Sequence, residues 1–146
     1  MSSFEVIWDE ATTLLTTRIR SPMAVADVAA YRDTLGQTLA TVPSGTTFTW
    51  LSSAVGYDAM ADRTAHLELR SVVPLALAAH GVRTSLLDMH QGAEIAVTQT
   101  RGIVCRAIAH VHHDAAKMDA YNEHLARSNE RYFGDEGSAL AWLKDR

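Results

Sequence analysis

The sequence predicts an α/β fold, in which a mixed, mostly parallel sheet opens with an antiparallel hairpin and has helices packed on it. Two strand-like runs follow one another within the first 20 residues, the first with the two-residue period of strands and the second rich in β-branched residues. Helical patterns then alternate with apolar strand-like runs, as in parallel sheets built with right-handed crossovers. Because no repeat, linker or low-complexity segment divides the 146 residues, we expect one domain over residues 1–146.

The N-terminal hairpin is indicated by Phe4, Val6 and Trp8, which have the period of a half-buried strand. A short polar turn leads to Leu14 to Arg20, a second run that is rich in β-branched residues. Since the link between the two runs is short, we expect the strands to pair antiparallel.

The first helix is expected to follow the hairpin, with Ser21 as its N-cap and Pro22 at its first helical position. Pro43 to Gly45 ends this helix, and Thr46 to Leu51 forms the third strand. The apolar face of the helix repeats at helical spacing and consists of Val28, Tyr31, Leu35, Leu39 and Val42.

The middle of the chain has a helical pattern over residues 58–80 that Pro74 interrupts, because proline cannot donate the backbone hydrogen bond needed there. We expect either a kink or two helices, the second beginning near Val72 and closed by Gly81. Val82 to Met89 has a strand pattern. Glu94 to Thr100 fits either a short helix or a strand, and we favour the helix.

The last third of the chain reads strand, helix, short strand, helix. Val104 to Val111 is mostly apolar on both faces, which is typical of a central strand. Asp114 and Asp135 are placed to cap the two helices, and Glu130 to Phe133 forms the short strand between them. The buried sides of these helices are expected to hold Met118, Tyr121 and Leu125, and then Ala139, Leu140, Trp142 and Leu143.

The composition excludes several classes of protein. A net charge of −4 and a pI near 5.9 argue against a nucleic-acid partner, which selects a basic face. The N-terminus has no signal-peptide pattern, and no apolar run is long enough for an integral membrane segment. Cys105, the single cysteine, lies in an apolar strand and is expected to be core rather than nucleophile. The cytoplasm is the expected location.

The closing segment, residues 130–143 (ERYFGDEGSALAWL) with Met118 and Tyr121 before it, resembles the C-terminal end of SpoIIAA-like proteins of the STAS fold. The N-terminal hairpin and the helix after it, with Asp27 and Tyr31 in its first turns, are similar to that family in layout. The resemblance is clearest over residues 104–143, weaker over 1–51 and poor between them.

This resemblance implies a SpoIIAA-like (STAS) fold and a bacterial, non-catalytic binding or regulatory module of unknown ligand. A small-molecule or apolar ligand, a protein partner and self-association into a homo-oligomer such as a homodimer are implied by the same resemblance. No cofactor is expected. Fold analogy alone does not settle function, so these remain expectations.

Two departures from the family pattern bear on mechanism. Residues 52–103 exceed what the compact family pattern needs, so an extra strand–helix pair or an extended hairpin is expected there. Family members that antagonise anti-sigma factors carry an Asp-Ser phosphorylation site after the third strand. The counterpart here is Asp58-Ala59, which has no hydroxyl for a phosphate. The resemblance therefore argues for the fold and against a phosphorylation switch.

Candidate ligand-binding residues follow the ends of the predicted strands, because ligands of open α/β sheets bind beyond the carboxyl ends of the strands. They are Ser52, Ser53, Asp88, His90, His110, His112, His113 and Asp114. If the sheet brings these ends together, they form a polar mouth with groups that titrate near neutrality.

An alternative function is a small metal-assisted enzyme that uses the cluster from His110 to Asp114. His110 and His112 project to one face of a strand, and with Asp114 they could act as metal ligands that His66, His80, His90 or His124 complete. The spacing matches no recognised metallohydrolase, so neither a catalytic residue nor a metal site is our first prediction. Ser52, His112 and Asp88 hold the residue types of a catalytic triad, but there is no Gly-x-Ser-x-Gly turn.

Overall fold

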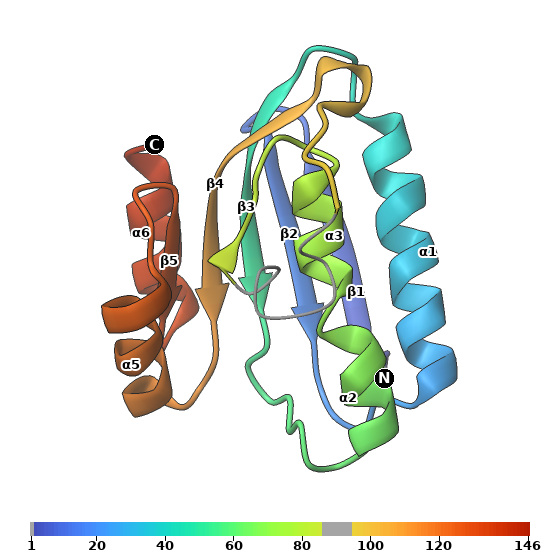
Figure 1. Ribbon diagram of the computed structural model, residues 1–146, viewed down its shortest axis with the longest axis vertical. Coiled ribbons are helices and arrows are strands. Elements are labelled where there is room, and N and C mark those ends of the chain that lie inside the picture. The colour runs from blue at the N-terminus through green and yellow to red at the C-terminus, as the bar shows by residue number, and fades with distance from the viewer. Residues whose placement is uncertain (1, 86–94) are drawn as a thin grey trace.

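A computed structural model describes residues 2–85 and 95–146 of the chain (Figure 1). In this part of the chain, one sheet holds β1 (Phe4–Asp9), β2 (Leu14–Ile19), β3 (Thr47–Ser53), β4 (Val104–Val111) and β5 (Glu130–Phe133), in that order. β1 pairs antiparallel with β2, and every later neighbour pair is parallel. The predicted mixed, mostly parallel sheet with an N-terminal antiparallel hairpin is confirmed.

The helices are α1 (Val25–Thr41), α2 (Arg63–Leu69), α3 (Val72–Ala78), α5 (Ala115–Leu125) and α6 (Glu136–Lys144), with a 3-10 turn, η1, at Thr100–Gly102. α1, α2 and α3 cover one face of the sheet, where Leu35 and Leu77 belong to the same buried cluster as Trp50. α6 covers the opposite face, where Leu143 packs with Ala109. The sheet therefore lies between two hydrophobic layers of unequal size.

Local signals in the sequence account for most of the observed boundaries. The helical pattern around Pro74 is divided into two helices, and the second begins at Val72 as predicted. The Asp114 carboxylate accepts a hydrogen bond from the Lys117 backbone at 3.1 Å, and Asp135 caps α6 in the same way. Short polar side chains at these positions satisfy backbone N–H groups that the helix leaves free, so both caps are confirmed.

The predicted start of the first helix is wrong. α1 begins at Val25 rather than at Pro22. The Ser21 hydroxyl accepts a hydrogen bond from the Asp58 backbone at 2.8 Å, so it is engaged by a neighbouring loop instead of by a helix. At the observed start of α1, the Asp27 carboxylate provides the capping interaction, because it accepts a hydrogen bond from the Ala24 backbone at 2.9 Å.

Two predictions in the middle of the chain also fail. Val82 to Thr84 are not part of a strand, because the Val82 N–H bonds to Leu77 and closes α3. Residues 86–89 of that predicted strand lie outside the described residues. Residues 95–98 are not helical either: Thr98 exchanges backbone hydrogen bonds with Ala78 and Gly81, so this segment pairs with the end of α3.

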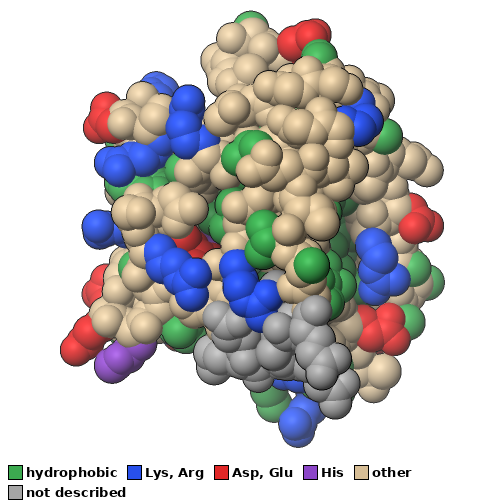
Figure 2. All heavy atoms as spheres, turned by 45° about the horizontal axis from the view of Figure 1, so that its top comes forward, with side chains coloured by type: hydrophobic (Ala, Val, Ile, Leu, Met, Phe, Trp, Pro, Cys, Tyr) green, Lys and Arg blue, Asp and Glu red, His purple; other side chains and the backbone are tan. Residues whose placement is uncertain are grey.

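On the face of the molecule drawn in Figure 2, basic and acidic side chains are interspersed. No helix in the described part of the chain is long and apolar enough to cross a membrane.

Candidate ligand-binding cavity

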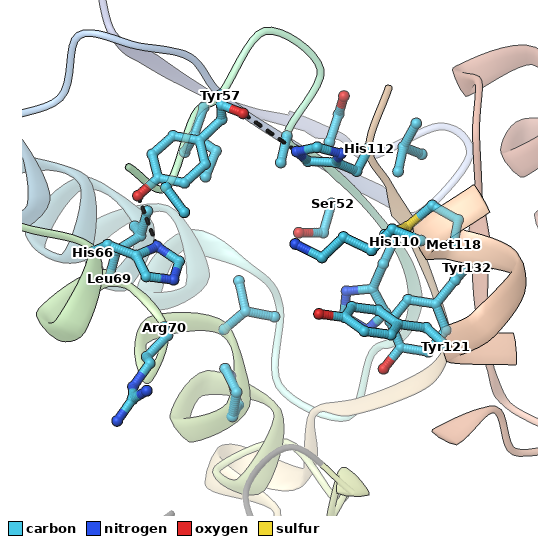
Figure 3. Close-up of a pocket in the computed structure, with 18 of the residues that line it drawn as sticks. Ser52, Tyr57, His66, Leu69, Arg70, His110, His112, Met118, Tyr121 and Tyr132 are labelled. Carbon is cyan, nitrogen blue, oxygen red and sulfur yellow. Dashed lines mark hydrogen bonds between the residues drawn. The ribbon is translucent and has the colours of Figure 1, made fainter. Parts of the chain in front are cut away.

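A half-open cavity of about 390 Å³ lies where the carboxyl ends of β3 and β4 meet α2, α3 and α5 (Figure 3). Its walls are largely apolar and include Ile19, Leu69, Val73 and Met118. The volume is within the range of small-molecule sites, and such sites typically combine apolar walls with a few polar groups. Figure 3 shows Tyr57 and His66 on one side and His110, Tyr121 and Tyr132 on the other.

The sheet register brings the polar groups of this cavity together. Ser52 on β3 is the direct neighbour of His110 on β4, which in turn is the neighbour of Tyr132 on β5. Trp50 and Ile108, two residues earlier on β3 and β4, belong to the core under α1 to α3. Since strand side chains alternate, Ser52 and His110 face the same side, above that core.

His110 is held by a buried carboxylate that the sequence analysis did not identify as part of the site. The His110 Nε2 atom lies 2.9 Å from Glu130 Oε2, and the Glu130 side chain is only 1% exposed. The His110 ring also stacks on Tyr132, with 4.7 Å between ring centroids. Ring position is thus fixed by one polar and one aromatic contact. The Nδ1 atom makes no hydrogen bond with a described residue, and the ring borders the cavity.

The histidines after β4 have separate local partners. The His112 Nδ1 atom accepts from the Asp114 backbone at 3.0 Å, and its Nε2 lies 3.2 Å from the Tyr57 carbonyl oxygen. The exposed His113 accepts from the Gly56 backbone at 3.3 Å. Burial, followed by the neighbouring His113, lowers the pKa of His112, so its neutral form is favoured near pH 7.

These contacts do not assemble the alternative metal centre. His110 is committed to Glu130, while Asp114 caps α5. In residues 2–85 and 95–146, no group of three or more histidine, cysteine, aspartate or glutamate side chains is arranged to hold a metal ion.

The structure therefore places some of the predicted site residues at the cavity and others away from it. Ser52, Ser53, His110 and His112 border the cavity, although the Ser53 hydroxyl accepts from the Val55 backbone at 3.4 Å. His113 and Asp114 are exposed and do not line it. The predicted residues Asp88 and His90 lie outside the described residues, and Asp88 is the member of the Ser52–His112–Asp88 triad that is thereby missing.

Lys117 supplies positive charge to the cavity although the chain as a whole is acidic. Its Nζ atom lies 5.6 Å from the centre of the Tyr121 ring, and it contributes to the lowered pKa of both His66 and His112. Those histidines come from different elements, so the ammonium group acts across the cavity. Burial is the larger cause of the His66 shift, and Arg70 contributes as well.

Tyr57 and His66 form the side of the cavity that lies opposite His110 and Tyr132. The Tyr57 hydroxyl lies 2.9 Å from His66 Nδ1 (Figure 3), and their rings stack with centroids 5.8 Å apart. Burial, with smaller effects from Asp62 and Asp58, raises the pKa of Tyr57. The phenol therefore stays protonated at neutral pH and acts as a hydrogen-bonding group.

The sequence did carry signals for some of these residues. Glu130 and Tyr132 alternate on a short strand, so a carboxylate shares the buried face with an aromatic ring. Lys117 and Tyr121 are four residues apart on α5 and so lie on one side of it. Neither pattern reveals which cavity the side chains border.

Comparisons with models of protein families, with curated proteins and with solved structures found no match to this chain.

Proposed function

We propose that this protein is a binding module of the STAS-like (SpoIIAA-like) type that holds a small organic anion with an apolar body. The observation that carries the proposal is the cavity of about 390 Å³, which has largely apolar walls and Lys117 on its lining. An apolar body gains from leaving water against such walls, and the ammonium group favours a negatively charged end.

The electrostatics of the cavity support an anion over a cation. Lys117 and Arg70 both border it, and, after burial as the main cause, Arg70 and Lys117 both lower the pKa of His66. Glu130, the carboxylate that contacts the lining residue His110, is paired with it and is almost inaccessible to solvent. A ligand cation would therefore meet positive charge at the lining and find no free carboxylate among the described lining residues.

The regulatory part of the proposal rests on the resemblance of residues 104–143 and on the observed strand order, which is consistent with a STAS-like arrangement. Ala59 borders the cavity and offers no hydroxyl for phosphorylation. We therefore propose that the protein is regulated by ligand binding rather than by phosphorylation. Self-association and a cytoplasmic location belong to the same proposal, and sedimentation velocity tests the former.

The experiment uses two fluorescent probes of similar apolar shape. 8-Anilinonaphthalene-1-sulfonate is anionic, whereas N-phenyl-1-naphthylamine is neutral. We expect both to bind, and Lys117→Gln to weaken the sulfonate roughly two- to fivefold, as expected for an ion pair with an exposed lysine, while leaving the neutral probe unchanged. Lys144→Gln is the matched control, because Lys144 is exposed at the end of α6, away from the cavity.

Two results would count against this function. One is the absence of saturable binding of either probe. The other is equal loss of sulfonate binding in Lys117→Gln and Lys144→Gln, because the charge effect would then come from the surface as a whole.

A further inference from the structure

The inner end of the cavity holds polar groups that the proposed function does not use. The Tyr132 side chain is 3% exposed and borders the cavity, and its hydroxyl has no hydrogen-bond partner among the described residues. Buried polar groups without a partner are rare in folded proteins, and each one is destabilising. The Tyr132 hydroxyl thus lacks the partner that a buried hydroxyl normally has, and a ligand group could supply one.

Two further groups lie beside it. His110 stacks on Tyr132 and has its Nε2 committed to Glu130, so Nδ1 is the nitrogen that remains for another partner. Ser52 is the neighbour of His110 on the adjacent strand, and its hydroxyl makes no hydrogen bond with a described residue. When Glu130 accepts from Nε2–H of a neutral imidazole, Nδ1 is an acceptor, whereas the phenol is a donor.

We propose that the inner end of the cavity recognises a hydroxyl group on the ligand, so that the ligand class is a hydroxylated organic acid with an apolar body. A hydroxyl is the smallest group that accepts from the Tyr132 phenol and donates to His110 Nδ1 at the same time. It also accepts from Nδ1–H if the imidazole becomes protonated. The inference rests on the proposed function, since it adds a second recognition point to the same cavity.

Both recognition points adjoin the Tyr121 ring, whose centre lies 5.6 Å from Lys117 Nζ and 5.3 Å from the centre of the Tyr132 ring. Lys117 Nζ and the Tyr132 ring centre are therefore at most about 11 Å apart. A single aromatic ring with a short carboxylate arm is of a size that fits within this limit. We therefore choose 3-(4-hydroxyphenyl)propanoate and, as its matched partner without the hydroxyl, 3-phenylpropanoate.

Isothermal titration calorimetry compares the two acids on the full chain. We expect the hydroxylated acid to bind roughly tenfold more tightly, because its hydroxyl satisfies a group that is otherwise buried and unpaired. In Tyr132→Phe the preference should fall to roughly twofold or less. Lys117→Gln should weaken both acids by the same factor and so preserve the preference. Ser52→Ala, which removes the third polar group, should leave at least half of the free-energy difference between the two acids.

Tyr132→Phe removes an oxygen with no partner, so we expect its thermal unfolding midpoint to be unchanged or raised, which separates a binding effect from a folding defect. Equal affinity of the two acids for the wild type overturns the hydroxyl inference and leaves the proposed function intact. An undiminished preference in Tyr132→Phe overturns it as well. If neither acid binds while the fluorescent sulfonate does, only the ligand class is wrong; if no probe binds, the proposed function fails too.

Discussion

Glu130 is a carboxylate inside the protein whose single described hydrogen-bond partner is His110, while its Oε1 atom has none. A charge buried in this way is tolerated only with a partner, because the interior solvates it poorly. The Glu130–His110 pair therefore contributes to the stability of the fold and also to the structure of the cavity wall. It holds the imidazole in place, and it makes the site sensitive to any change of either residue.

Removal of His110 alone should be strongly destabilising. We expect His110→Ala to lower the free energy of unfolding by about 3–5 kcal/mol, because it leaves Glu130 buried and uncompensated. Adding Glu130→Gln should recover a large part of the loss, since a neutral amide is easier to bury. Urea denaturation of the two single variants and the double variant measures this coupling.

His124→Ala is the control, since His124 is exposed near the end of α5. We expect it to change stability by no more than about 0.5 kcal/mol. A double variant as unstable as the sum of the two single variants would contradict the coupling.

At the scale of elements, α5 and β5 are joined by Asn122 at the edge of the sheet. Its side chain donates to the Tyr132 carbonyl at 2.6 Å and accepts from the Tyr132 N–H at 2.8 Å. These bonds satisfy backbone groups that an edge strand otherwise leaves open. They also fix Tyr132 relative to Lys117 and Tyr121, so that the two recognition points of the cavity are held together.

α6 is tied to the opposite face of the sheet by an ion pair. The Arg18 guanidinium on β2 contacts both carboxylate oxygens of Glu136 at the start of α6, with Nη2 2.9 Å from Oε1 and Nε 3.1 Å from Oε2. Arg18 also pairs with Glu5 on β1 at 2.7 Å. The hydrogen bonds from Arg18 are the main cause of the lowered pKa of Glu136.

We expect Glu136→Gln to destabilise the protein by about 1 kcal/mol at pH 7, a modest value because the pair is partly exposed. Glu136 has a lowered pKa in the folded state, so its contribution is present above the unfolded pKa and is lost as the pH falls through the folded one. The difference from wild type should therefore be smaller at pH 3 than at pH 7. Urea denaturation at both pH values measures it.

Glu123→Gln is the matched control, as Glu123 is an exposed carboxylate on α5. It should leave stability nearly unchanged at either pH. A Glu136→Gln deficit of the same size at pH 3 and pH 7 would show that the ion pair is not its cause.

Elements were predictable from the sequence where the signal was local. The caps at Asp114 and Asp135 and the break at Pro74 each depend on backbone groups within one turn. The prediction failed at Ser21, because its hydroxyl bonds to Asp58, which is distant along the chain, and such a tertiary contact overrides local preference. At Val82 the deciding bond is local, since the Val82 N–H bonds to Leu77 at the end of α3, and there the strand pattern itself was misleading.

For the site, as for the elements, the sequence predicted only those residues whose position depends on local signals. Ser52, His110 and His112 lie at the carboxyl ends of β3 and β4, and a parallel sheet collects such ends at one edge. Glu130 contacts His110 because of the register between β5 and β4. Lys117 borders the cavity because of the path that α5 takes. The sequence does not specify that register, so the partner of His110 and the charge of the cavity emerged only with the structure.

At the scale of the whole molecule, Cys105 reports on the integrity of the core. It is 2% exposed on β4, and burial raises the pKa of its thiol to about 12. Thiolate is the reactive form, so the native protein should react with 5,5′-dithiobis(2-nitrobenzoate) only when it unfolds. We expect labelling to be slow in buffer and to accelerate along the urea unfolding transition.

Rapid labelling in buffer, at the rate of a free thiol, would show that β4 opens without global unfolding. Comparison of the labelling curve with the circular dichroism transition separates the two cases.

The strand order β1-β2-β3-β4-β5 follows the chain without a single interchange. Each strand that leaves the ribosome can therefore add to an edge that already exists, and no earlier strand has to be displaced. Glu130 and Tyr132 come from the last strand added, and α6 follows them to cover the second face. A nascent chain can thus hold β1 to β4 and still lack Glu130 and Tyr132, so the candidate site is complete only after β5 has joined the sheet.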